Sequence, residues 1–214
     1  RNTVGDSSPE AHERQMSTEL NVATTTYLDD VFTFLDCPGS IEFVQDAINA
    51  LVGADGAVVV CEPEADKAIM LMPVLRQLSD LGLPHFIFVN KMDRASGTIT
   101  DLMSALQEAS EKPLVLRHLP IIDGETVTGY VDLASLRAFS YRPGEASEAI
   151  DVPAEIADEV AQARYEMLEK LADFDDSLME QLLEDQEPDQ DGAYEHLASI
   201  TRDGHVVPIL IGTA

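Results

Sequence analysis

The stretch His85-Phe86-Ile87-Phe88-Val89-Asn90-Lys91-Met92-Asp93 decides how the rest of the chain is interpreted. Its apolar run, residues 86–89, consists of aromatic and β-branched residues and predicts a short strand buried on both faces. The run stops abruptly at three polar residues, Asn90, Lys91 and Asp93. Because ligands of open α/β sheets bind just beyond the carboxyl ends of the strands, these residues form a candidate binding site.

Each polar residue of this cluster can perform a task on a planar base. The Asp93 carboxylate can accept two hydrogen bonds from adjacent N–H groups on one edge of a ring, which is the pattern that guanine offers. The stem of Lys91 can lie across the face of the base while its ammonium stays in water. The Asn90 amide can tie the loop to neighbouring backbone. A strand followed by an ordinary polar turn explains the tetrapeptide Asn90-Lys91-Met92-Asp93 equally well.

Composition and charge exclude several classes of protein. The 214 residues are 45% hydrophobic and carry a net charge of −27. Contacts to nucleic acid and anionic lipid need Lys and Arg, so we expect no membrane association and no direct sequence-specific nucleic-acid partner. The two cysteines, Cys37 and Cys61, supply no disulfide framework and fit a reducing cytosol. We also expect neither a membrane span nor a signal peptide.

A second polar site follows the strand predicted at residues 31–35. It reads Asp36-Cys37-Pro38-Gly39. An Asp at a strand end can hold Mg²⁺, often through a water, and a Gly just beyond lets a backbone N–H approach a phosphate. Taken alone, Asp-x-Pro-Gly is more often only a turn. Before this site we expect a mobile polar loop that runs into an edge strand at residues 20–27, with a turn at Asp29-Asp30.

Strands and helices alternate through the middle of the chain. Helices are predicted over residues 40–51, 66–81 and 98–110, and buried strands over residues 56–61 and 86–89. This alternation implies a parallel sheet wound with right-handed crossovers.

The pattern changes near Pro113, where alternating apolar residues predict antiparallel strands. The elements expected beyond it are a hairpin turning at Asp123-Gly124, a loop from Arg142 to Asp151, amphipathic helices beginning at Pro153 and after Asp175, a solvated acidic loop at residues 184–191 rather than a metal site, and a last buried strand at residues 206–211. An antiparallel and helical insertion therefore interrupts an α/β domain.

The two polar sites are weak signals separately but specific together, because each follows a strand and one strand–helix unit separates them. They resemble the Asp-x-x-Gly and Asn-Lys-x-Asp elements of a GTPase. Together with Gly5-Asp6-Ser7-Ser8-Pro9-Glu10, the insertion and the closing Val-Pro-Ile-Leu-Ile-Gly-Thr-Ala, they make the whole chain similar to the G domain of elongation factor G.

The resemblance implies an α/β fold of the P-loop GTPase type, with a mostly parallel sheet flanked by helices and an α+β insertion. The implied segments are a GTPase core at residues 1–112, the insertion at residues 113–203, and the last strand with the guanine-contacting loop at residues 204–214.

The same resemblance implies which residues contact the base. Asp93 would bind the guanine edge, with Asn90 and Lys91 supporting the base. Thr213 and Ala214 lie in the loop whose backbone N–H would contact the guanine oxygen.

The resemblance also implies which residues face the phosphates. Asp36 would lie near Mg²⁺, and the Gly39 amide would meet the γ-phosphate. The segment Arg14–Thr18 matches the first switch, and Ser17 falls where the family has a Thr whose hydroxyl binds Mg²⁺.

The chain departs from the family pattern in two places. The family has a His that positions the attacking water where this chain has Ser40, which puts fast hydrolysis in question because positioning supplies most of the rate in phosphoryl transfer. None of the four lysines follows a glycine, so the Gly-x-x-x-x-Gly-Lys-Ser/Thr phosphate loop is missing. We expect this loop and its strand to lie before Arg1 in a longer protein.

The resemblance implies a GTP hydrolase that uses GTP/GDP and Mg²⁺ and acts in the cytoplasm on the ribosome, including its stalk proteins. A monomer and a role in translocation are expected. Two alternatives stay open: a slowly hydrolysing ribosome-protection or regulatory paralogue, and a non-catalytic interaction module formed by the isolated chain.

Overall fold

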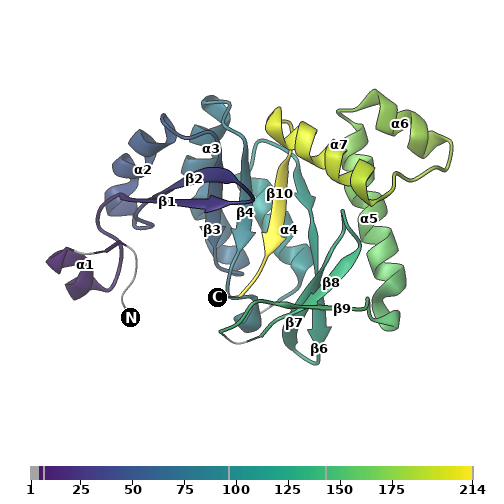
Figure 1. Ribbon diagram of the computed structural model, residues 1–214, viewed down its shortest axis with the longest axis horizontal. Coiled ribbons are helices and arrows are strands. Elements are labelled where there is room, and N and C mark those ends of the chain that lie inside the picture. Colours follow the sequence, from purple (N-terminus) through teal and green to yellow (C-terminus); the bar gives the residue numbers. More distant parts are fainter. Residues whose placement is uncertain (1–4, 7, 96, 143, 214) are drawn as a thin grey trace. The chain divides into compact units, whose positions relative to one another are not determined.

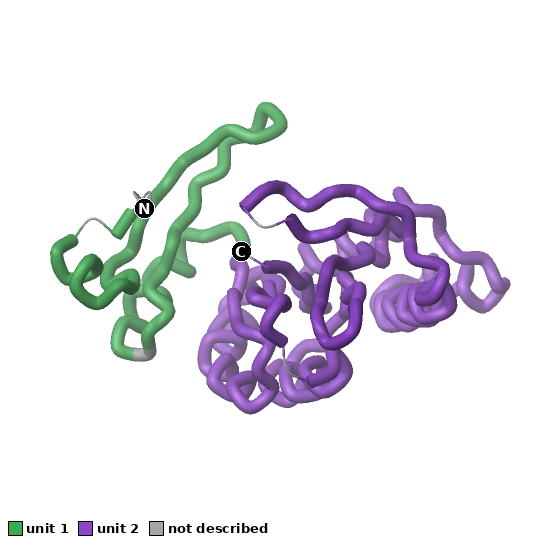
Figure 2. The backbone as a smooth tube through the Cα atoms, turned by 90° about the horizontal axis from the view of Figure 1, so that it is seen from below, with its two compact units in different colours: residues 1–56 green, residues 57–214 purple. Residues whose placement is uncertain are grey.

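The chain folds as two compact units, Arg1–Gly56 and Ala57–Ala214 (Figure 2). The computed structural model describes residues 5–6, 8–95, 97–142 and 144–213. The second unit contains both the parallel strands and the residues of the expected insertion. The sequence pattern does not indicate this division.

The first unit is built around one β-hairpin. Its elements are α1 (Pro9–Arg14), β1 (Asn21–Tyr27), β2 (Asp30–Asp36), the 3₁₀ helix η1 (Ile41–Phe43) and α2 (Val44–Leu51). Strands β1 and β2 pair antiparallel from Asn21 opposite Asp36 to Tyr27 opposite Asp30. Both predicted strands are therefore present, within a residue of their expected ends.

Three details of the first unit differ from expectation. Helix α1 replaces part of the expected loop, because Ser8 accepts the Ala11 N–H at 3.2 Å as an N-cap and is followed by a proline. The hairpin turns at Leu28 and Asp29, whose φ angles of 50° and 67° are both left-handed. The helix expected from Ser40 begins as the 3₁₀ helix η1, and the α-helical part starts only at Val44.

The second unit contains the expected parallel sheet (Figure 1). Its strands are β3 (Ala57–Cys61), β4 (His85–Val89), β5 (Leu114–Leu116) and β10 (Val207–Ile211). The order is β3-β4-β10-β5, and every neighbouring pair is parallel. The parallel sheet thus continues beyond residue 112, since β5 pairs with β10. The mixed architecture confirms the predicted α/β class.

Helices connect these strands as predicted. They are the 3₁₀ helix η2 (Ala65–Leu71), α3 (Met72–Asp80), the single 3₁₀ turn η3 (Met92–Arg94) and α4 (Ile99–Ala109). The helix expected over residues 66–81 starts in 3₁₀ form, and α4 starts at an N-cap, Thr98, whose hydroxyl accepts the Asp101 N–H at 3.1 Å.

An antiparallel sheet, one 3₁₀ helix and three α-helices follow. The strands are β6 (His118–Asp123), β7 (Thr126–Asp132), β8 (Arg137–Ser140) and β9 (Glu148–Ile150), and the helices are η4 (Ala154–Ile156), α5 (Ala157–Ala172), α6 (Asp176–Leu183) and α7 (Gln190–Arg202). Gly124, with φ of 63°, occupies the predicted hairpin turn between β6 and β7. Strand β9 and helix α7 are additional elements that the sequence analysis does not predict.

One hydrophobic core joins the insertion to the parallel sheet. Val115 of β5 and Val206 before β10 belong to the same buried cluster as Val131 of β7, Leu168 of α5 and Leu197 of α7. The prediction that this helix is amphipathic is confirmed for α5, because Val160, Met167 and Leu171 are all buried. The insertion is therefore packed onto the sheet and has no separate core.

The expectation that β3 is a buried strand is wrong for its alternate residues. Val59 is 9% exposed, whereas Val58 and Val60 are 52% and 59% exposed. Strand β3 lies at the edge of its four-stranded sheet, and successive side chains point to opposite faces. Its alternate residues consequently face away from the core of the second unit.

Candidate functional site

The Asn90–Asp93 loop lies at the carboxyl edge of the parallel sheet, between the ends of β3 and β10. The Asn90 N–H donates to the Cys61 carbonyl at 2.8 Å, and the Met92 N–H donates to the Gly212 carbonyl at 3.1 Å. The Gly212 N–H in turn donates to the Val89 carbonyl at 2.9 Å. Three strand ends therefore fix the loop at the edge where ligands of α/β sheets bind.

Lys91 leans toward the β3 side of this edge. Its φ of 60° is left-handed, and its N–H donates to the Asn90 side-chain oxygen at 2.8 Å, so the Asn90 amide holds the turn. The Lys91 ammonium donates to the carboxylate of Glu62, the residue that directly follows β3. Met92, 3% exposed, anchors the loop in the core.

Asp93 leans toward the β10 side. Its side chain is 43% exposed, so its carboxylate is available to a ligand. One carboxylate oxygen accepts the Thr213 hydroxyl at 2.6 Å, and the Arg94 Nε lies 3.7 Å from the other. The structure thus brings together Asn90, Lys91, Asp93 and Thr213, while Ala214 lies outside the described residues.

Only a glycine fits at position 212, because the Phe88 ring lies against it. A Cβ at this position would lie 2.4 Å from Cζ of Phe88, whose ring belongs to β4. Real Cβ contacts are longer than this, so any side chain would displace either the ring or the loop. The glycine lets β10 run past the Phe88 ring and deliver Thr213 to Asp93.

The predicted phosphate-side residues all lie in the first unit. Asp36 is the last residue of β2 and is exposed, and Gly39 is exposed with no atom within 4 Å of a hypothetical Cβ. Ser40 is half-buried, and its hydroxyl accepts the Glu42 N–H at 3.4 Å while its carbonyl accepts the Phe43 N–H at 3.0 Å. Ser17 lies half-buried between α1 and β1.

The donor chemistry of these residues fits Mg²⁺. The Asp36 carboxylate and the Ser17 hydroxyl are oxygen ligands, the type that Mg²⁺ prefers, and Mg²⁺ is typically bound by one or two protein groups plus waters and phosphates. Among the residues that the structure describes, no group of three or more His, Cys, Asp or Glu side chains could hold a metal ion.

Within the same residues, no helix is long and apolar enough to span a bilayer.

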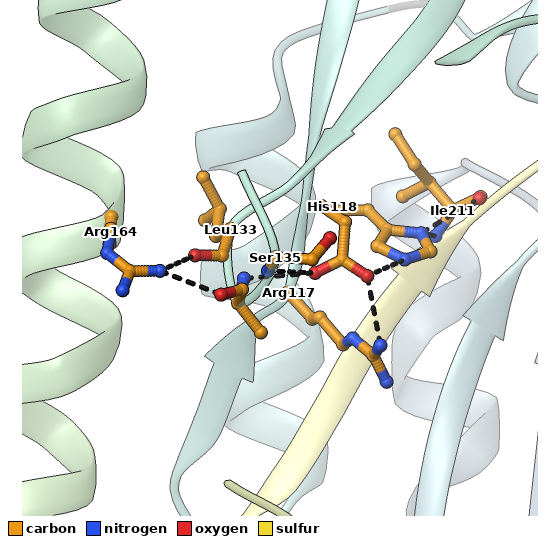
Figure 3. Close-up of polar contacts among 8 residues, drawn as sticks. Arg117, His118, Leu133, Ser135, Arg164 and Ile211 are labelled. Carbon is orange, nitrogen blue, oxygen red and sulfur yellow. Dashed lines mark hydrogen bonds and ion pairs between the residues drawn. The ribbon is translucent and has the colours of Figure 1, made fainter. Parts of the chain in front are cut away.

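A buried polar network behind the site is absent from the sequence predictions (Figure 3). The Ile211 N–H, next to Gly212, donates to Nδ1 of His118 at 3.3 Å. Nε2 of His118 lies 3.8 Å from Asp132, which also accepts Arg117 at 2.9 Å. Burial alone would raise the pKa of Asp132, but the nearby His118 ring together with the charge and hydrogen bond of Arg117 outweigh it and lower that pKa well below its usual range.

The same network continues into the helical part of the insertion. The second carboxylate oxygen of Asp132 accepts the N–H groups of Ala134 and Ser135. The carbonyls of Leu133 and Ala134 accept the Arg164 guanidinium from α5 (Figure 3). No local sequence pattern predicts this network, because its members are separated by up to 93 residues along the chain.

The parallel sheet with its Asn-Lys-x-Asp edge defines a nucleotide-binding α/β domain of the GTPase class. The model of the family described as the elongation factor Tu GTP binding domain matches residues 1–214, and the chain belongs to this family. This result confirms the resemblance predicted from the sequence.

Named relatives and a solved structure agree with this assignment. An elongation factor G-like protein of Synechocystis is 46% identical over the whole chain, which covers 32% of that relative. Elongation factor G of Thermotoga maritima is 27% identical over the whole chain, which covers 31% of it. A crystal structure from Thermus thermophilus superposes with a TM-score of 0.84 at 26% identity, over 99% of this chain and 32% of that one. The chain thus spans about a third of the length of these relatives.

Proposed function

We propose that the full-length protein binds GTP and GDP with Mg²⁺ and couples GTP hydrolysis to a step of translation on the ribosome, the step being translocation. The observation that carries the proposal is the Asn90–Asp93 loop, whose Asp93 carboxylate is exposed, held by Thr213 and located at the ligand edge of the sheet. The match of the whole chain to a GTP-binding domain family supports it.

In this proposal the second unit recognises the base. The two Asp93 oxygens accept the adjacent N–H groups of guanine, which adenine lacks in that arrangement. The Lys91 stem covers one face of the base, and the backbone of Thr213 and Ala214 contacts the guanine oxygen. The pairing of several donors with specific acceptors makes discrimination against adenine strong, because a wrong base leaves buried polar groups unpaired.

In this proposal the first unit serves the phosphates. Asp36 and Ser17 hold Mg²⁺, which neutralises phosphate charge when it is bound. The Gly39 N–H meets the γ-phosphate, and the open space around Gly39 leaves room for that approach.

The test is nucleotide binding and ribosome-stimulated phosphate release by the full-length protein. We expect tight binding of GTP and GDP, none of ATP, and phosphate release that rises when ribosomes are added. Asp93→Asn should weaken guanine-nucleotide binding by about 100-fold, since hydrogen bonds to a charged group contribute about 1.5–3 kcal/mol each. Equal binding of ATP and GTP would overturn the proposal.

A second candidate function is favoured by Ser40. Its short side chain already accepts the Glu42 N–H, and it cannot supply the imidazole with which the family positions the attacking water. The full-length protein would then be a slowly hydrolysing ribosome-protection or regulatory factor that binds GTP equally well. Ser40→His should raise ribosome-stimulated hydrolysis with little change in GTP affinity; an unchanged rate removes this candidate.

The acidic exposed face of α5 is a candidate surface for contact between the insertion and the ribosome. Asp158, Glu159, Glu166 and Glu169 are all exposed on this helix. We propose that this face contacts a ribosomal stalk protein and that the protein acts as a cytoplasmic monomer. Reversing the charge at Glu166 and Glu169 should reduce ribosome-stimulated hydrolysis while the basal rate stays constant, and sedimentation should report one copy in solution.

A further inference from the structure

The carboxylate of Glu62 is the feature of the ligand edge that the proposed function leaves unexplained. Glu62 follows β3 directly, so it stands at the same carboxyl edge of the sheet as the Asn90–Asp93 loop on β4. It accepts a hydrogen bond from the Lys91 ammonium across 29 residues of sequence. Its other oxygen lies 3.4 Å from the Lys67 ammonium.

These contacts make Glu62 a bridge between two lysines. Lys67 is also 2.8 Å from Glu64, so its ammonium sits between two carboxylates. The hydrogen bonds from Lys91 and Lys67 lower the pKa of Glu62, so the carboxylate is ionised at neutral pH. The bridge keeps Glu62 oriented toward Lys91 even in the absence of a ligand.

The two charged side chains of the loop are consequently drawn apart. Lys91 is tied to Glu62 beyond β3, whereas Asp93 is tied to Thr213 beyond β10, and β4 lies between those two strands. With its backbone fixed by the left-handed φ of 60° and its ammonium fixed by Glu62, the aliphatic stem of Lys91 is held at both ends. This stem is the surface on which a base can stack.

We propose that Glu62 is a positioning residue for nucleotide binding, which holds the Lys91 stem in place for the purine ring before the nucleotide arrives. The inference rests on the proposed function of Lys91 at the base. A free lysine side chain carries rotamer entropy, part of which binding must otherwise overcome. Order that exists before binding raises affinity without adding any contact to the ligand.

The expected effect is modest because Lys91 and Glu62 are 45% and 39% exposed. Pairs between side chains this exposed contribute little, so we expect a change of only about two- to fivefold in affinity. Glu62→Gln should therefore weaken GDP binding about two- to fivefold, mainly through faster dissociation. The difference from the unmodified protein should shrink at high salt, because salt screens exposed pairs.

Glu64→Gln is the matched control. It removes the same charge from the same segment and the same partner, Lys67, but it leaves the contact with Lys91 intact. Its GDP dissociation rate should stay within about 1.5-fold of the unmodified protein. In a Lys91→Met background, Glu62→Gln should cause no further change, an outcome that a merely structural role of Glu62 would not produce.

The experiment is stopped-flow dissociation of fluorescent GDP from the full-length protein and these variants, at low and high salt, with thermal melting of each. If the unmodified protein binds no guanine nucleotide, the proposed function itself fails. If it binds and Glu62→Gln dissociates GDP at the rate of Glu64→Gln, or more slowly, the proposed role of Glu62 is wrong. An equal effect of Glu62→Gln in the presence and absence of Lys91 would also overturn it.

Discussion

Replacement of Arg164 by methionine tests how the insertion is held together. The Arg164 residue is 4% exposed, and its guanidinium donates to the carbonyls of Leu133, Ala134 and Pro188, the last two at 2.9 Å. Its Nε also lies 3.5 Å from Glu187. One side chain on α5 thus fixes the turn after β7 and the segment that leads into α7.

The expected loss of stability follows from the hydrogen bonds that methionine cannot donate. Leu133 and Ala134 are completely buried, so the loss of the guanidinium leaves two carbonyls without this donor and without water. Each such group costs about 1–3 kcal/mol, and the methionine side chain recovers part of the loss through apolar burial. We therefore expect Arg164→Met to lower the free energy of unfolding by about 3–4 kcal/mol, or the melting temperature by roughly 10 °C.

Urea unfolding followed by circular dichroism measures this change, and hydrogen exchange locates it. The amides of Leu133 to Ser135 should lose protection in Arg164→Met. Arg76→Met is the control, since Arg76 is 69% exposed and its only ion pair among the described residues is with Glu111 at 3.6 Å; we expect a change within about 0.5 kcal/mol. A loss below 1 kcal/mol for Arg164→Met would refute the reasoning.

Three further predictions concern other parts of the chain. Burial raises the pKa of Asp175, but hydrogen bonds from Ser177 and His196 outweigh it and lower that pKa from 3.8 to about 2. Its contribution to stability is therefore present above about pH 4 and lost as the pH falls through 2, so the difference in unfolding free energy from Asp175→Asn should vanish across that window. Burial and the charge of Glu62 raise the pKa of Cys61 to about 11; iodoacetamide at pH 8 should modify it about 100-fold more slowly than a thiol of ordinary pKa, as peptide mass spectrometry can check. A Cβ on Gly129 would lie 2.1 Å from the Phe139 carbonyl oxygen, whereas the nearest atom to one on Gly53 is 3.8 Å away; thermal melting should show a loss of about 3 kcal/mol for Gly129→Ala and almost none for Gly53→Ala.

Local patterns predict the elements whose signal lies within a few residues. The apolar run of β4, the Asp123-Gly124 turn and the 3.6-residue period of α5 are each visible in a short window, and all three occur in the structure. Helix α7 has the same kind of signal, with Ala193, Leu197 and Ile200 buried along one face. The acidic run before it and the glycine at 192 obscure that period, although Asp189 forms an N-cap to Gly192 at 2.8 Å.

The contacts that organise the site cannot be predicted in this way, because they depend on which strands become neighbours. Asn90 and Asp93 are indicated by their position at a strand end. The pairing of Lys91 with Glu62, by contrast, requires that β3 lie beside β4, and the contact of His118 with Ile211 requires that β6 begin beside the end of β10. A charged residue directly after a buried parallel strand is nevertheless a usable signal, and Glu62 carries it.

The placement of β10 determines the order in which the second unit can assemble. This strand follows the insertion in the sequence and pairs with both β4 and β5, so the parallel sheet stays incomplete until residues 207–211 dock. Closing the roughly 90 residues between β5 and β10 as a flexible loop costs about 4 kcal/mol of chain entropy. If the insertion folds first, less of this entropy is lost when β10 docks. The Arg117 N–H then donates to the Ile209 carbonyl, and the Val207 N–H donates to the Pro113 carbonyl. Docking of β10 also brings Thr213 to Asp93, so the hydrogen bond that holds the Asp93 carboxylate forms only after residues distant in sequence have paired.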